Sequence, residues 1–101
     1  MKNIVLLCAA GMSTSLLVTK MKEAAAAEGF ECNINAYSLS EARKVVPDAD
    51  IVLLGPQVRF NQKRIKGDFP EKIVECIEMR DYGTMNGAAV VKFAKQKMGL
   101  E

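Results

Sequence analysis

Four short stretches of the chain have the hydrophobic pattern of β-strands. Residues 3–8 (NIVLLC) and 50–54 (DIVLL) are almost continuously apolar, which is typical of parallel strands buried on both faces. Residues 30–37 (FECNINAY) alternate between apolar and polar side chains, as in a strand near the edge of a sheet. Residues 72–77 (KIVECI) follow a proline and complete a predicted set of four strands.

Helical periodicity separates these strands. Residues 16–28 carry apolar side chains at helical spacing, and Gly29 is a typical helix end. Ser38 and Glu41 have the spacing of a capping box, which predicts a short helix that Pro47 ends. The first two strands are therefore each followed by a helix.

The second half of the chain repeats this order. The Gly55-Pro56 turn predicts a helix that runs to about Lys66 and ends before Gly67, although its apolar pattern is weak. A loop over residues 78–83 then leads to a last helix. The inner stripe predicted for that helix consists of Val90, Val91, Ala94 and Met98.

A strand and a helix thus alternate four times, which is typical of a parallel sheet with helices on both faces. Right-handed crossovers leave few topologies for such a chain. We predict an α/β fold with a four-stranded parallel sheet in the order 2-1-3-4, similar to small flavodoxin-like and low-molecular-weight-phosphatase-like folds. The chain has 101 residues, half of them apolar, so residues 1–101 are expected to form one domain.

Composition narrows the possible functions. Fourteen Lys and Arg against twelve Asp and Glu give a net charge of +2, which does not favour nucleic-acid binding. The absence of His excludes zinc sites and general bases built on the chain's own histidines, and no metal or cofactor is predicted. No apolar run approaches the roughly 18–20 residues of a membrane span, and the apolar start is interpreted as a buried strand rather than a signal peptide.

The cysteine pattern points to a compartment. The chain has three cysteines, an odd number, and they form no C-x-x-C pair: Cys8, Cys32 and Cys76. This pattern predicts free thiols in a reducing cytoplasm. Cys32 and Cys76 fall inside predicted strands and are interpreted as small core residues. Cys8 ends a strand and is the candidate for chemistry.

The predicted topology places a site at one edge of the sheet. In open α/β sheets, ligands bind beyond the carboxyl ends of the strands where the strand order reverses, which here falls between the first and third strands. The loops at residues 8–15, 55–59 and 79–84 are expected to converge there. The first of these loops carries the most informative residues.

A nucleophile, small residues and hydroxyl groups follow one another in this loop. Backbone N–H groups of such a loop, together with the start of the next helix, form a cradle for an anion and favour the thiolate of a nearby cysteine. Gly11 is expected at a positive φ, and Met12 either presents apolar surface to a partner or is buried. The hydroxyl groups either cap the helix or donate to phosphoryl oxygens. The predicted phosphate-binding loop after the nucleophile Cys8 consists of Ala9, Ala10, Gly11, Met12, Ser13, Thr14 and Ser15.

Three functions agree with a cysteine that faces a phosphate cradle. A phosphoryl carrier is favoured, because the loop has no Asp, Glu or Arg. A small cysteine phosphatase or an arsenate-reductase-like enzyme is the alternative, but Thr14 stands where the phosphatase pattern C-x5-R-[ST] has its Arg clamp. A regulatory thiol or phosphate-binding domain is the third possibility.

Four segments carry a resemblance to a known family, and the resemblance covers essentially the whole chain. They are the strand NIVLLC, the loop CAAGMSTSLLV, the segment IVLLGPQV and the tract DYGTMNG. The sequence resembles the IIB component of the bacterial sugar phosphotransferase system, in the lactose/cellobiose (chitobiose) family. The family's loop commonly begins C-S-A-G, so Ala9 removes one hydroxyl group and leaves the backbone cradle unchanged.

The resemblance implies a function and two partners. Cys8 would accept phosphate from a phosphohistidine of a IIA component and pass it to a sugar transported by a membrane IIC component, the sugar being a β-linked disaccharide such as cellobiose, chitobiose or lactose. Pro56, Gln57 and Tyr82 would contact phosphate or a partner at the rim, or, for Tyr82, pack as a lid over the loop.

A cationic stripe completes the candidates. Arg59, Lys63 and Lys66 share one predicted helical face. Such a stripe is usually a solvated surface, and the alternative is a docking patch for an acidic surface.

Overall fold

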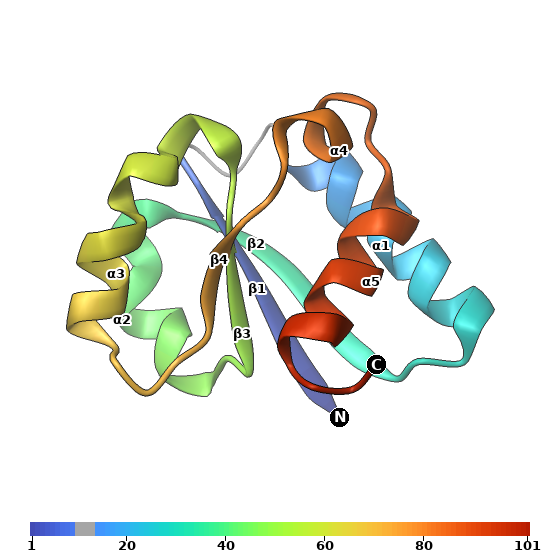
Figure 1. The fold of residues 1–101 in the computed structure, drawn as a ribbon, viewed down its shortest axis with the longest axis horizontal. Coiled ribbons are helices and arrows are strands. Elements are labelled where there is room, and N and C mark those ends of the chain that lie inside the picture. The colour runs from blue at the N-terminus through green and yellow to red at the C-terminus, as the bar shows by residue number, and fades with distance from the viewer. Residues whose placement is uncertain (10–13) are drawn as a thin grey trace.

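A four-stranded parallel sheet forms the centre of the protein (Figure 1). The structure is a computed structural model, and it describes residues 1–9 and 14–101. The strands are β1 (Lys2–Cys8), β2 (Cys32–Ser38), β3 (Ile51–Leu54) and β4 (Val74–Cys76). Their order is β2-β1-β3-β4, and every neighbouring pair is parallel. This confirms the predicted fold class, strand order and edge position of the second strand.

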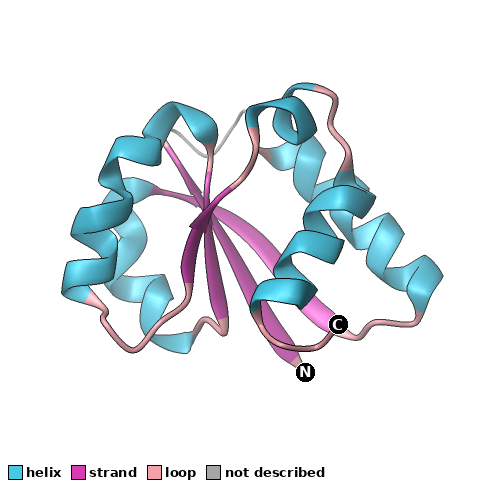
Figure 2. Cartoon of the chain, in the orientation of Figure 1, coloured by secondary structure: helices cyan, strands magenta, loops and turns pink. Residues whose placement is uncertain are grey.

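Helices cover both faces of this sheet (Figure 2). The longest are α1 (Ser15–Glu28) and α5 (Gly87–Lys97), which lie side by side on one face. The other face is covered by α2 (Ala42–Val45), α3 (Gln62–Asp68) and three 3-10 segments, η1 (Leu39–Glu41), η2 (Val46–Asp48) and η3 (Pro56–Asn61). A one-turn helix, α4 (Met79–Gly83), lies between β4 and α5.

The continuous apolar runs in β1 and β3 are explained by burial on both sides. Ile4 and Leu6 face the core under α1 and α5, whereas Val5 and Leu7 face the core under α2 and α3. All four residues of β3 are buried. A parallel strand in the middle of a covered sheet therefore has no solvated face on which a polar residue would be tolerated.

The helix pair on the first face packs at close range. Leu17 and Met21 of α1, and Val91 and Ala94 of α5, are fully buried. Gly87 opens α5 directly against α1, because a Cβ atom there would lie 2.4 Å from the backbone carbon of Lys20. Glycine is thus required by the distance between the helices.

Several predicted boundaries hold. Gly29 ends α1 with φ 71° and donates its backbone N–H to the carbonyl groups of Ala25 and Ala26, as a left-handed helix end does. The backbone N–H of Ser38 donates to Oε2 of Glu41 at 3.1 Å, as the capping box predicts.

Other boundaries were wrong. The helix predicted from Pro56 to Lys66 begins as the 3-10 segment η3 and is α-helical only in α3. Inside η3, the buried Val58 kinks the segment with a non-helical φ of −120°. Gly67 lies inside α3 rather than after it. The loop predicted over residues 78–83 contains α4.

Candidate functional site

The carboxyl ends of β1 and β3 bring two loops together. Cys8 is the last residue of β1 and exposes none of its surface. Gly55 follows β3, and its backbone N–H donates to the carbonyl oxygen of Leu7 at 2.9 Å. A Cβ atom on Gly55 would lie 3.6 Å from Cβ of Cys8. The third-strand loop thus starts beside the candidate nucleophile, as the strand order predicted.

Thr14 points at the sulfur atom. It occupies the N-cap position of α1 but forms no side-chain capping bond, and its Oγ1 lies 3.4 Å from Sγ of Cys8. Within residues 1–9 and 14–101 it is the one polar residue that is buried. The sequence left open whether this hydroxyl group caps the helix or serves the site, and its direction favours the site.

Gln57 and Tyr82 form the rim. Nε2 of Gln57 donates to the hydroxyl oxygen of Tyr82 at 3.1 Å, and Oε1 of Gln57 lies directly beside Gly55. This bond joins the loop after β3 to α4, which follows β4. The rim residues proposed from the sequence are therefore close to one another and, through Gly55, to Cys8.

The remaining loop residues divide into two groups. Ala9 is exposed next to Cys8, and Ser15 is exposed as the first residue of α1. The predictions for Ala10, Gly11, Met12 and Ser13 lie outside the described residues.

A shallow hollow of about 420 Å³ adjoins this rim. Phe60 and Met79 project into solvent there, with 79% and 65% of their surface exposed. Sequence reasoning missed both residues, although a phenylalanine between Arg59 and Asn61 was a detectable signal, because a large apolar residue in a polar segment is seldom a core residue. The hollow is lined by Pro56, Gln57, Arg59, Phe60, Met79, Tyr82 and Gly83.

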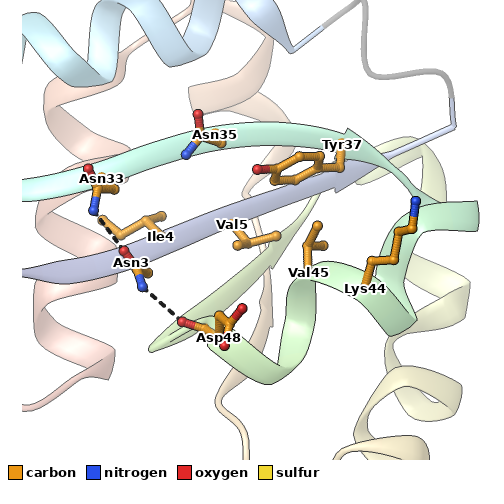
Figure 3. Close-up of a pocket in the computed structure, with 9 residues that line it drawn as sticks. All are labelled: Asn3, Ile4, Val5, Asn33, Asn35, Tyr37, Lys44, Val45 and Asp48. Atoms are coloured by element: carbon orange, nitrogen blue, oxygen red, sulfur yellow. Dashed lines mark hydrogen bonds between the residues drawn. The ribbon is translucent and has the colours of Figure 1, made fainter.

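A second cavity, of about 220 Å³, lies along β1 and β2 (Figure 3). Two of its amide groups are hydrogen-bonded to each other and to the backbone: Asn33 Nδ2 donates to Asn3 Oδ1 at 2.9 Å, and Asn3 Nδ2 donates to the carbonyl oxygen of Asp48 at 2.9 Å. These bonds join β2, β1 and η2, which gives the amides of Asn3 and Asn33 a structural role.

The three thiols differ in their surroundings. All are free, as predicted. Burial raises the pKa of the Cys32 thiol. Burial, and then the Glu75 carboxylate, raise the pKa of Cys76 against the opposing effect of Lys66 and Arg59. Cys32 and Cys76 are half-buried against the two cores, so both thiols are poor nucleophiles at neutral pH.

Residues 1–9 and 14–101 contain no group of three His, Cys, Asp or Glu side chains that would hold a metal ion. Across the same ranges, no helix combines the length and apolar character that crossing a membrane requires.

Comparison with known proteins identifies the family. The sequence model of the family described as "PTS system, Lactose/Cellobiose specific IIB subunit" matches residues 3–93. A galactose-specific EIIB component of the PTS from Lactococcus lactis subsp. cremoris is 41% identical over 104 residues, which cover 96% of each chain. A lactose-specific EIICB component from Lactococcus lactis subsp. lactis is 26% identical, and the match covers 96% of this chain but 16% of that longer protein.

A solved structure agrees with the sequence matches. The solution structure of a cellobiose-specific phosphotransferase IIB component from Borrelia burgdorferi superimposes with a TM-score of 0.81 at 40% identity, over 97% of this chain and 92% of that one. The chain therefore belongs to the lactose/cellobiose-specific IIB subunits of the phosphotransferase system.

Proposed function

We propose that the protein is a cytoplasmic phosphoryl carrier in which Cys8 is the phosphorylated residue. The observation that carries the proposal is the position of Cys8, at the end of a central strand where the site of an open α/β sheet is expected, with Thr14 Oγ1 3.4 Å from its sulfur atom. A IIA component supplies the phosphoryl group from a phosphohistidine. A sugar held by a membrane IIC component receives it.

The chemistry consists of two displacements at phosphorus. In the first, Sγ of Cys8 attacks, the S–P bond forms and the N–P bond breaks, while the departing imidazole takes up the thiol proton. In the second, a sugar hydroxyl group attacks, the O–P bond forms and the S–P bond breaks, and the hydroxyl proton returns to the sulfur. Each step exchanges one bond to phosphorus for another, so the carrier ends unchanged.

Thr14 favours transfer over hydrolysis. A single hydroxyl group can donate to one phosphoryl oxygen, whereas an arginine would clamp two and add positive charge. The phosphoryl group stays ready to leave because one hydroxyl group and backbone N–H groups hold it without a charged clamp. The loop that supplies these N–H groups consists of Ala9, Ala10, Gly11, Met12, Ser13, Thr14 and Ser15. This arrangement suits a carrier better than the alternative phosphatase or arsenate-reductase-like enzyme.

The rim residues belong to the same proposal. Gln57 and Tyr82 bond to each other at 3.1 Å, and Pro56 starts η3 next to Gly55. Cys8 exposes none of its surface, so some neighbouring group must shift before a phosphoryl group reaches Sγ. Gln57 is exposed and lies beside Gly55, which makes its side chain a suitable moving part.

The proposed identities of the sugar and of the partners are inferred from the names of the relatives. One relative is named for galactose, and two are named for the β-linked disaccharides lactose and cellobiose. We propose a β-linked disaccharide for the present chain. The longer relative is named an EIICB component, which supports a membrane IIC component as the second partner.

Labelling with a cognate phospho-IIA component tests the proposal. We expect a single phosphate on the peptide that contains Cys8, measured by mass spectrometry. Cys8→Ser should remain folded and lose sugar phosphorylation, whereas Cys32→Ser and Cys76→Ser should both retain it. Phosphate on Cys32 or Cys76, or rapid hydrolysis of an aryl phosphate by the protein alone, would contradict the carrier function.

A further inference from the structure

A long cationic stretch of the chain has no counter-charge. No Asp or Glu occurs between Asp50 and Asp68. The same stretch contains four cations, all exposed, on η3 and α3: Arg59, Lys63, Arg64 and Lys66. None of them is among the residues that we propose to hold the phosphoryl group at Cys8.

These four cations are not paired with carboxylates. In the part of the chain that the structure describes, the ion pairs join Arg80 to Asp81 and Lys95 to Glu28 and Glu101. Asp68 at the end of α3 and Glu71 beyond it are the nearest acidic residues in sequence, and neither forms an ion pair there. Glu75, whose carboxylate affects the pKa of the same Cys76 thiol as Lys66 and Arg59 do, forms no ion pair with either of them in the described residues, so the four cations remain available to a partner.

The cations surround the outward side of one short helix. Ile65 of α3 is buried against the sheet. Residues 63, 64 and 66 therefore lie on the remaining arc of the helix at 100° per residue. Figure 1 shows α3 at the outer side of the molecule, on the face of the sheet opposite α5.

An exposed aromatic side chain lies in the same segment. Phe60 belongs to η3, is 79% exposed and stands between Arg59 and the cations of α3. Met79, which is 65% exposed, lines the same hollow as Phe60. Clustered cations with exposed apolar side chains at their border are typical of surfaces that lie on a membrane interface.

We propose that the basic face, defined as Arg59, Phe60, Lys63, Arg64 and Lys66, binds an anionic lipid surface. The four cations are all exposed, and within the described residues no ion pair ties any of them to a carboxylate, which suits the diffuse negative charge of a bilayer. Phe60 would enter the headgroup region. Each cation near such a surface raises binding roughly fivefold, and salt weakens the effect.

The proposed function supplies a use for this binding, although the lipid affinity does not depend on Cys8. A carrier that delivers phosphate to a membrane-bound sugar benefits from time spent near the bilayer. Because η3 starts beside Gly55 and Cys8, contact through the basic face would hold the carboxyl edge of the sheet close to the membrane.

Vesicle sedimentation of the full chain tests the inference. We expect binding at low salt to vesicles of equal parts phosphatidylglycerol and phosphatidylcholine, and little binding to phosphatidylcholine alone. Lys63→Gln with Arg64→Gln should reduce that binding about 30-fold, since two cations are lost. The matched control, Lys22→Gln with Lys92→Gln, removes the same charge from exposed positions on α1 and α5 and should stay within about threefold of the parent.

Further measurements separate the alternatives. Phe60→Ser should also weaken binding, and Cys8→Ser should bind as the parent does, so that a failure of the carrier function leaves this result standing. Absence of binding to the anionic vesicles, or equal losses in the two double variants, would overturn the proposal. Loss of IIA binding in the basic-face variant without any vesicle binding would assign the face to an acidic protein instead. Thermal unfolding of each variant checks that it is folded.

Discussion

The layer formed by α1 and α5 differs in construction from the carboxyl edge around Cys8. The layer consists of long helices whose buried side chains are apolar, and Gly87 allows their backbones to touch. The edge consists of short loops and one-turn segments, and polar side chains contact one another there, as Thr14 contacts Cys8 and Gln57 contacts Tyr82.

This difference separates stability from function. Apolar burial over two helices contributes many small attractions that resist unfolding together. A hydrogen bond between two side chains contributes roughly 0.5–1.5 kcal/mol and can be exchanged for another. Substitutions in the layer should therefore lower stability, and substitutions at the edge should change phosphoryl transfer while the fold persists.

Gly87→Ala should have the largest effect on folding. The added methyl group would lie 2.4–2.6 Å from backbone atoms of Lys20 and Met21, which cannot rotate away, so the helices must separate. We expect a loss of about 2–3 kcal/mol in the free energy of unfolding, measured with urea.

Gly67→Ala is the matched control for this prediction. Its added methyl group meets no atom within 4 Å among the described residues, and alanine favours the helix, so stability should rise by up to about 1 kcal/mol. Equal stability of the two variants would show that the distance between α1 and α5 adapts easily.

After the loss of Cys8 itself, Thr14→Val should have the largest effect on transfer. Valine keeps the volume of the buried side chain but removes the hydroxyl group that lies 3.4 Å from Sγ of Cys8. If that group holds a phosphoryl oxygen, the rate of phosphate transfer to sugar should fall by about tenfold to a hundredfold, with a modest change in stability. Thr19→Val, at an exposed position of α1, should transfer normally. Full transfer by Thr14→Val would remove Thr14 from the site.

Gly55→Ala should have an intermediate effect at the rim. Its methyl group would lie 2.5 Å from Oε1 of Gln57, and because that atom ends a flexible side chain, Gln57 should move and lose its bond to Tyr82. We expect a few-fold change in transfer rate and a shift of the Gln57 side-chain amide signals in NMR spectra. Gly83 lines the same hollow, but a methyl group added there would meet no atom within 4 Å in the described chain. Gly83→Ala should therefore leave the transfer rate and the Gln57 amide signals unchanged.

Lys95→Gln should have the smallest effect, in the α1–α5 layer. Hydrogen bonds to Glu28, and then to Glu101, raise the pKa of Lys95 despite some desolvation. A raised pKa in the folded state means that this stabilisation is complete at neutral pH and is lost as the pH rises through the pKa of Lys95. The melting temperature of the variant should lie slightly below that of the parent near neutral pH and converge with it in strongly alkaline solution.

Lys97→Gln is the control for this prediction, because it removes an exposed cation that has no ion pair in the described residues. A difference that persisted in alkaline solution would point to lost packing instead.

Local patterns predicted most of the architecture. The continuous apolar runs indicated strands covered on both sides, and the alternation with helices indicated parallel pairing. Right-handed crossovers left few strand orders, and the predicted one, β2-β1-β3-β4, is confirmed. The same reasoning placed Cys8 at the switch in strand order. Errors fell where a tertiary contact overrides local preference, as inside η3, where the buried Val58 kinks the start of the predicted third helix.

The sequence by itself determined the fold, the family resemblance and the candidate nucleophile, because these depend on short-range periodicity and on contiguous motifs. Only the tertiary structure decided that Thr14 turns toward sulfur, that Gln57 bonds to Tyr82, and that Gly87 touches α1. The last two contacts join residues 25 or more positions apart, and the first depends on where β1 directs the Cys8 side chain. Such contacts arise from the pairing of the strands and the packing of the helices on them, which no local pattern of residues records.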